Sequence, residues 1–231
     1  SVSGLIFSNI DSIAGSNSDQ DTLIGADLDA IWRFTDSEYS YHAGGAQIVF
    51  SGFENLQGGS GKDIMDYSGY GSDISIDLQT NTISGIAGTF SGMEEVWGST
   101  GTNDRIMAKD SGSTFAISSV KSGIADGWLA FKDIEDIYGS GNDKLDFRAV
   151  EEAIQLHIAG ISAQSGFTGN EYVCGIRFSG INEIIGTGAS DRAIGTSAAA
   201  VWSITGNGTS NYQVGEHTLT LSSIEHIVGS S

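Results

Sequence analysis

Five aspartates are the residues whose type and spacing could do chemistry, because each follows a glycine-containing turn at a similar place in the chain: Asp21, Asp63, Asp104, Asp143 and Asp191. A carboxylate in such a turn can accept hydrogen bonds from nearby backbone amides. Paired carboxylates could also serve as acid and base in glycoside hydrolysis. The chain has 29 Asp and Glu residues, too many for one pair to be singled out. The spacing therefore favours turn residues that bind backbone amides.

The basic residues and the histidines show no comparable order. The 10 Lys and Arg residues are scattered singly, and the formal net charge is −19. This balance excludes a nucleic-acid partner, which requires clustered positive charge. A lyase for acidic polysaccharide would likewise need a basic cleft. The four histidines form no recognisable pair and are predicted to lie on the surface: His42, His157, His217 and His226.

A single cysteine excludes an internal disulfide. In an extended chain Cys174 shares one face with Ile176 and Phe178. We therefore predict a buried, unreactive thiol. No run of about 18 apolar residues is present, so no membrane span is expected.

A nine-residue pattern recurs six times and organises the whole chain. One copy reads Phe50-Ser51-Gly52-Phe53-Glu54-Asn55-Leu56-Gln57-Gly58, and the copies begin near residues 7, 50, 90, 131, 178 and 221. We call each copy an anchor, and the steps between anchors range from 40 to 47 residues. After each anchor come the turn aspartate, a short alternating run and a glycine-rich stretch. The acidic residues inside the anchors are predicted to form a solvated face: Asp11, Glu54, Glu94, Glu135 and Glu225.

The segments between turns are short, alternate with period two and contain no proline. That pattern is typical of strands, whereas helical periodicity is nearly absent. The best candidate for a helical turn is the stretch 147–158. Stacking of like units predicts an all-β, right-handed parallel β-solenoid, or β-helix, that forms one domain of tandem repeats over residues 1–231. Each repeat is predicted to make two coils of about 20 residues, which gives about 11 coils in total.

Two segments carry a resemblance to known proteins. The run Gly58-Gly59-Ser60-Gly61-Lys62-Asp63-Ile64-Met65-Asp66 is similar to the nonapeptide of calcium-binding β-rolls, and Gly139 to Asp146 is similar to a lesser degree. The wider pattern resembles repeat regions of large secreted bacterial surface proteins, namely RTX-type and filamentous-haemagglutinin-like adhesins. The resemblance implies candidate Ca²⁺ ligands at Gly58, Gly59, Gly61, Asp63, Asp66, Asp143 and Asp146. Calcium rolls use tandem nonapeptides, however, and here the next aspartate turn arrives a full repeat later.

The repeat and its resemblance favour a structural or adhesive module of an extracellular fibre or cell-surface adhesin, without enzymatic activity. Gly15 and Gly229 end matching anchors, and neither end of the sequence shows a polar cap. The expected partners are flanking repeats of a longer chain or further copies that add end to end into filaments, with a cell-surface or carbohydrate ligand. Two alternatives stay open. They are an extracellular polysaccharide-acting enzyme and a calcium-binding RTX-type module of a secreted enzyme.

Overall fold

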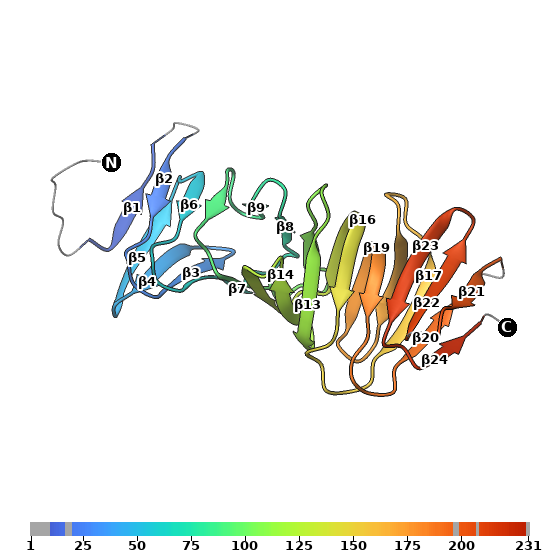
Figure 1. Ribbon diagram of the computed structural model, residues 1–231. Helices are drawn as coiled ribbons and strands as arrows, with labels where there is room; N and C mark the ends of the chain where they lie inside the picture. Colours follow the sequence, from blue (N-terminus) through green and yellow to red (C-terminus); the bar gives the residue numbers. More distant parts are fainter. Residues whose placement is uncertain (1–9, 17–19, 196–198, 207, 230–231) are drawn as a thin grey trace.

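The computed structural model describes residues 10–16, 20–195, 199–206 and 208–229, and this part of the chain is all β. The molecule is elongated, with β1 (Ser12–Ala14) near one end and β24 (His226–Val228) near the other (Figure 1). The described residues contain no helix, and the stretch 147–158 leads through an irregular segment into a strand. Accordingly, no helix in the described ranges could cross a membrane.

Each repeat uses the same five kinds of strand, which we name by their place in the repeat. The Phe strands carry the first residue of each anchor: β5 (Ala46–Ser51), β10 (Phe90–Ser91), β15 (Leu129–Lys132), the first half of β19 (Ile176–Ile185) and β23 (His217–Ser222). The anchor strands carry its seventh residue: β1, β6 (Asn55–Gln57), β11 (Glu95–Trp97), the first half of β16 (Asp136–Asp146), the second half of β19 and β24.

The other three kinds of strand follow the aspartate turn. The Asp strands come directly after it: β2 (Thr22–Ile24), β7 (Asp63–Gly69), β12 (Arg105–Met107), the second half of β16 and β20 (Arg192–Gly195). The run strands are the alternating segments: β3 (Ala30–Thr35), β8 (Ser75–Asp77), β13 (Thr114–Ser119), β17 (Gln155–Ile161) and β21 (Val201–Ile204). The return strands lead back to the next anchor: β4 (Tyr39–Ala43), β9 (Thr82–Ile83), β14 (Ser122–Ala125), β18 (Phe167–Glu171) and β22 (Thr209–Val214).

Parallel ladders connect successive repeats in a fixed order. Each ladder begins with a run strand, which pairs with the Asp strand of the next repeat. That Asp strand pairs on its other edge with the anchor strand of the following repeat, and this anchor strand pairs in turn with a Phe strand. In the ladder β3–β7–β11–β15 the aligned residues are Trp32, Met65, Val96 and Phe131, all buried. The same order aligns Ile76, Ile106, Ile137 and Phe178, and then Phe115, Leu145, Ile184 and Leu221. These columns form one continuous apolar core, which confirms the β-solenoid of stacked repeats.

The solenoid has about six turns, so the prediction of about 11 coils is wrong. The second half of each repeat folds back as antiparallel strands instead of making a second coil. In the first repeat β3, β4 and β5 form such a meander, and Gly44 and Gly45 turn the chain with φ of 57° and 82°. Two consecutive residues with positive φ are typical of a tight β-hairpin. These two glycines therefore form a hairpin turn, not the corner of a second coil.

The last glycine of an anchor lies against the third residue of the next anchor. Gly58 donates its backbone N–H to the Ser91 carbonyl at 2.8 Å, and a Cβ on Gly58 would overlap the carbonyl oxygen of Gly92. The same contact pairs Gly15 with Gly52, Gly98 with Asp133, Gly139 with Gly180 and Gly186 with Ser223. All five third residues have φ between 54° and 76°. The Phe-Ser-Gly sequence of the anchors thus supplies the left-handed residue, and the final glycine supplies the space beneath it.

Candidate functional site

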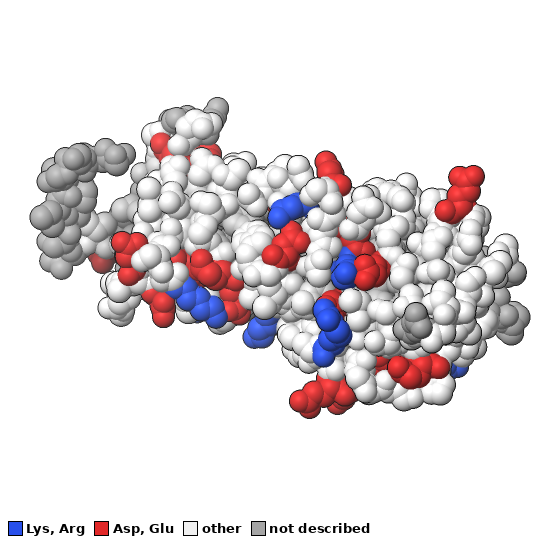
Figure 2. Space-filling view, viewed as in Figure 1, with Lys and Arg blue, Asp and Glu red and all other residues white. Residues whose placement is uncertain are grey.

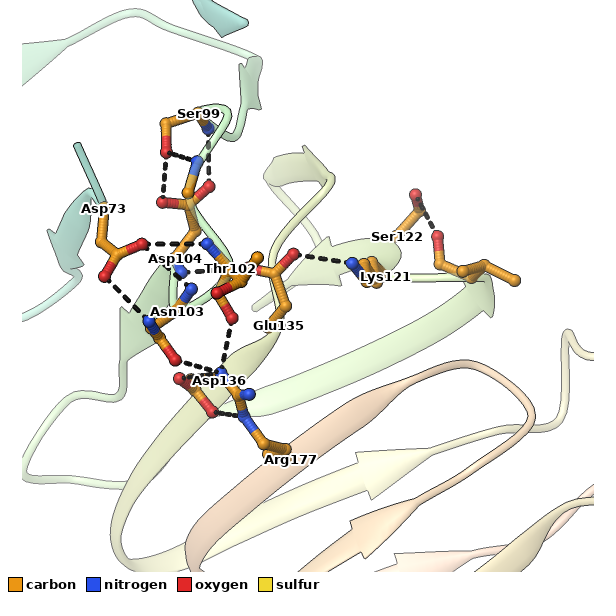
Figure 3. Close-up of polar contacts among 12 residues, drawn as sticks. Asp73, Ser99, Thr102, Asn103, Asp104, Lys121, Ser122, Glu135, Asp136 and Arg177 are labelled. Atoms are coloured by element: carbon orange, nitrogen blue, oxygen red, sulfur yellow. Dashed lines mark hydrogen bonds and ion pairs between the residues drawn. The ribbon is translucent and has the colours of Figure 1, made fainter. Parts of the chain in front are cut away.

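Asp104 shows how the turn aspartates act (Figure 3). Its side chain is fully buried. Its Oδ1 accepts from the backbone N–H of Ile74, in the repeat before, at 2.7 Å, and its Oδ2 accepts from the N–H of Ser99 at 2.6 Å. The backbone N–H of Asp104 donates to Oε2 of Glu135, in the repeat after, at 3.0 Å. One aspartate therefore joins three successive repeats.

The other turn aspartates repeat this arrangement. Each caps its own turn through one carboxylate oxygen, accepting from Ser16, Gly59, Ser140 and Thr187 respectively. The second oxygen reaches the repeat before in three of them. Asp63 accepts from Nε1 of Trp32 at 2.9 Å, Asp143 from the N–H of Ser113 at 2.7 Å and Asp191 from the N–H of Ile154 at 2.8 Å. The prediction that these residues bind backbone amides in turns is confirmed.

The acidic residues of the anchors accept hydrogen bonds from the backbone N–H groups of the turn aspartates. The prediction of a solvated face did not include this role. Glu54, Glu94 and Glu225 accept the backbone N–H of Asp21, Asp63 and Asp191 at 3.0, 2.7 and 2.8 Å. Glu94 and Glu225 are exposed as expected, but Glu135 is only 6% exposed and also binds Nζ of Lys121 at 2.8 Å. For Glu135 the solvated-face prediction is wrong, because its carboxylate lies between two coils.

The fifth anchor departs from this pattern. Asn182 stands where the other anchors have an acid, and its Oδ1 is buried without a hydrogen-bond partner. Asn182 lines an open cavity together with Asp143, Lys144, Glu183 and Thr220. Glu183 is paired with Lys144 at 3.0 Å. Among the coil boundaries that the structure describes, this cavity marks the one where the aspartate network lacks its acidic partner.

The candidate calcium ligands are not brought together as one site. Gly58, Gly59 and Gly61 form the turn before β7, which begins at Asp63, whereas Asp143 and Asp146 lie on β16. β7 pairs with β3 and β11, and β16 pairs with β12, β13 and β19, so the two groups lie in separate ladders. Across the described ranges no cluster of three or more His, Cys, Asp or Glu side chains could hold a metal ion.

The groups around these carboxylates are N–H hydrogen-bond donors, whereas a bound cation needs oxygen ligands. Asp63 and Asp143 face backbone and indole N–H groups, as described above. Asp66 binds Nε of Arg33 at 3.1 Å, and Asp146 binds Nε of Arg148 at 2.9 Å. The bond from Arg148 lowers the pKa of Asp146, whereas burial raises the pKa of Asp63. Because Ca²⁺ needs six to eight oxygen ligands, these residues in this arrangement do not fit it.

A second polar cluster lies around Arg177 (Figure 3). Its guanidinium binds Asp136 on the neighbouring strand through two bonds, Nε to Oδ1 at 2.6 Å and Nη2 to Oδ2 at 2.8 Å. Nη2 also donates to the carbonyl of Thr102 at 2.8 Å and to Oδ1 of Asn103 at 3.1 Å. Asp73 accepts from the side chain of Asn103 at 3.0 Å. The cluster therefore ties side chains of four successive repeats at the surface.

The other basic residues are similarly engaged. Eight of the ten form ion pairs with acidic side chains: Arg33, Lys62, Lys109, Lys121, Lys132, Lys144, Arg148 and Arg177. Cζ of Arg105 lies over the ring of Tyr138, 5.9 Å from the centre of the ring. On the face shown in Figure 2, basic side chains lie singly among acidic ones and do not gather in a patch. The molecule thus presents no basic cleft on that face.

The cysteine and the histidines complete the set of reactive side chains. Cys174 is 1% exposed, on the same buried face as Ile176 and Phe178, so the predicted buried thiol is confirmed. Burial and the nearby Glu171 raise the pKa of Cys174 to about 12. His42 lies beside Oγ of Ser40 at 2.9 Å, and burial lowers the pKa of His42. These environments do not activate a nucleophile.

The chain was also compared with known proteins. No protein-family model matches the sequence, and no curated protein matches it.

Proposed function

We propose that this chain is a structural module of an extracellular fibre or cell-surface adhesin. It acts as a stiff β-solenoid spacer that holds attached parts at a fixed separation. The observation that carries the proposal is the repeated bond set at the coil boundaries. Each turn aspartate caps its own turn, and its backbone or its side chain reaches a neighbouring repeat. The same arrangement at boundary after boundary is what an extended load-bearing element requires.

The direction of the ladders supports a mechanical role. Successive strands of a ladder belong to successive repeats, so tension along the solenoid loads the hydrogen bonds between coils. Those bonds include the backbone bonds of the ladder, the Gly58 to Ser91 type of bond and the aspartate network. Each bond contributes about 0.5–1.5 kcal/mol to stability. Acting in parallel at one boundary, they resist separation together.

The surface and the reactive side chains fit this role better than catalysis. An enzyme for acidic polysaccharides would need unpaired basic side chains in a cleft, whereas eight of ten are neutralised by ion pairs. The buried aspartates are already bonded to N–H groups. A net charge of −19 would keep neighbouring rods from clumping. In this proposal the module lies outside the cell, where it stacks on flanking repeats or on further copies. Its ligand is a cell-surface molecule or a carbohydrate.

Single-molecule force spectroscopy tests the proposal. The chain is held by handles at its two ends and stretched along the solenoid. We expect unfolding in discrete steps with a force peak for each group of coils. The double variant Asp104→Asn with Asp191→Asn should lower the peaks, whereas Asp133→Asn, at an exposed position, should leave them unchanged. Smooth extension at low force would contradict a load-bearing role, as would release of sugar products from an acidic polysaccharide.

A further inference from the structure

A groove of about 340 Å³ lies on the outer surface of β16, β18 and β19. Most of the side chains that line it alternate along the strands with buried core residues, so they point away from the core. The strand registers arrange them in two adjacent rows: Asp136, Arg177 and Asn170 in one, and Tyr138 and Ser179 in the other. The polar cluster around Arg177 thus forms one side of the groove. The volume is within the range of small-molecule sites, about 300–1,000 Å³.

Tyr138 presents an open aromatic ring beside this groove. Trp97 has the same place in the preceding anchor, and there Nζ of Lys132, its register partner, lies over the ring, 5.1 Å from the centre. In its own ladder Tyr138 is paired with Ser179, which is too short to cover the ring. Arg105 approaches Tyr138 from β12, on the edge of β16 opposite to the groove. Tyr138 is therefore 37% exposed, whereas Trp97 is half-buried.

The polar side chains beside the ring keep hydrogen-bonding capacity that no described residue uses. Arg177 engages Nε and Nη2 in its cluster, which leaves Nη1 without a hydrogen-bond partner among the described residues (Figure 3). The side-chain amide of Asn170 likewise forms no hydrogen bond within the described ranges. Thr168 donates its hydroxyl to the Phe178 carbonyl at 3.0 Å, so its oxygen is still able to accept. The groove thus offers a donor, an amide and an acceptor next to an aromatic ring.

The residues of the groove depart from the repeat pattern. Two other anchor strands pair with their Phe strands in the same register, and there Ala130 and Thr220 stand in place of Arg177. In the second of these ladders Ile185 stands in place of Tyr138. The same strands therefore pair without arginine or tyrosine at these outward positions. The fold does not by itself require this combination of side chains.

We propose that this groove binds a neutral pyranose sugar. A pyranose ring has a face of C–H bonds, which packs on an aromatic ring, and a rim of hydroxyl groups, each of which both donates and accepts hydrogen bonds. Tyr138 supplies the stacking surface. Arg177 and Asn170 supply partners for the hydroxyl groups. This inference rests on the proposed adhesive function, since it names the class of ligand and the place where that ligand binds.

The charges in the groove favour a neutral sugar over an acidic one. Asp136 neutralises the guanidinium of Arg177 through two bonds, of 2.6 and 2.8 Å, and the chain has a formal net charge of −19. A sugar carboxylate would approach Asp136 without a free cation to balance it. Because the bonds of the cluster already fix the guanidinium, binding a hydroxyl group costs little side-chain freedom.

NMR titration of the wild-type chain tests the site, with the methyl glycosides of glucose, galactose, mannose and N-acetylglucosamine as probes. We expect saturable binding of at least one of them, with shifts of the amide signals of β18 and β19. Tyr138→Ala removes the stacking surface and should weaken binding at least about tenfold. Trp128→Ala is the matched control, because Trp128 is 39% exposed and lies outside the groove, and it should leave binding unchanged.

A second variant fills the groove instead of emptying it. Ser179→Lys introduces the residue that the neighbouring ladder already carries at this position, Lys132, and gives up the contact of the Ser179 hydroxyl with Ser162. We expect it to fold, as measured by thermal unfolding, and to weaken binding at least about tenfold by covering Tyr138.

Three results would overturn the proposal. The first is wild-type binding in both Tyr138→Ala and Ser179→Lys. The second is no saturable binding of any of these glycosides at high millimolar concentration. The third is tighter binding of methyl glucuronide than of every neutral glycoside. None of these results bears on the stretching experiment, which measures the bonds between coils, so a chain that bears load and binds no sugar would refute this site alone.

Discussion

The backbone amide of Asp104 donates to the Glu135 carboxylate at 3.0 Å, across the boundary between two coils. The carboxylate of Asp104 meanwhile accepts from Ile74 in the coil on the other side. A residue that would otherwise be a simple turn former is thus bonded to the coil on each side.

Replacing Asp104 by asparagine should destabilise the fold. The side-chain NH₂ group of asparagine can donate but not accept, so one of the buried N–H groups of Ile74 and Ser99 loses its acceptor. We expect the free energy of unfolding to fall by about 1–3 kcal/mol, as measured by urea denaturation. Asp133→Asn is the control. Asp133 is exposed and left-handed, a conformation that asparagine tolerates, and a change within about 0.5 kcal/mol is expected. Equal unfolding midpoints for the two variants would contradict this role of Asp104.

Replacing Gly186 by alanine should be more damaging. Its Cβ would overlap the carbonyl oxygen of Ser223 in the next coil, and neither backbone can move without breaking the ladder. We expect a loss of about 3 kcal/mol or more, or failure to fold, by thermal and urea unfolding. Gly188→Ala, two residues away in open space, should change stability by less than about 0.5 kcal/mol. Comparable effects of the two substitutions would show that the coils are not packed as described.

The stability should depend on pH through Asp146. Because Arg148 lowers the pKa of Asp146 in the folded state, its contribution to stability is fully present above the ordinary pKa of 3.8. That contribution is lost as the pH falls further, through the folded-state pKa. Asp146→Asn should therefore reduce stability at neutral pH and flatten the acid-induced loss below about pH 4. Burial raises the pKa of Asp63, so Asp63 should oppose this trend and gain stability on protonation. An unchanged pH profile in Asp146→Asn would refute this assignment.

Calcium should not affect the fold. The carboxylates of Asp63, Asp66, Asp143 and Asp146 already bind N–H donors or arginine, so a cation would have to displace those groups. We expect the melting temperature in EDTA to match that in millimolar Ca²⁺, by differential scanning fluorimetry. Isothermal titration calorimetry with Ca²⁺ should show no saturable heat. A rise of several degrees with Ca²⁺, abolished by Asp63→Asn, would instead support the site that the β-roll resemblance implies.

The inner columns of the solenoid could be predicted from the sequence, because the anchors repeat them literally. Phe131 and Phe178 stand at the same position in their anchors, and each ends a parallel ladder. The antiparallel hairpins could not be predicted in the same way. Alternation with period two describes parallel and antiparallel strands equally well. Glycines such as Gly44 and Gly45 suit either a coil corner or a hairpin turn, so the number of coils was overestimated.

The polar contacts, too, could be predicted only in part from the sequence. Each turn aspartate could be identified from its place after a glycine. Its partners in the neighbouring coils depend on which strands pair, which residue types alone do not specify. Asp136 and Arg177 are one repeat apart, and the chain pairs their strands. Alignment of the repeats does not bring them together, because Asp136 lies on an anchor strand and Arg177 on a Phe strand. Neither residue stands out in its own stretch of sequence, so the pair was not predicted.

The ladders imply that the unit that recurs in the sequence is smaller than the unit that can fold on its own. A single repeat contributes its run, Asp, anchor and Phe strands to four different ladders, so alone it would retain only its hairpins. The ladder from Trp32 to Phe131 draws on four consecutive repeats. An excised fragment must therefore run at least from Ala30 to Lys132 to contain this complete ladder. Truncation below that length should abolish cooperative folding altogether, instead of yielding a shorter rod.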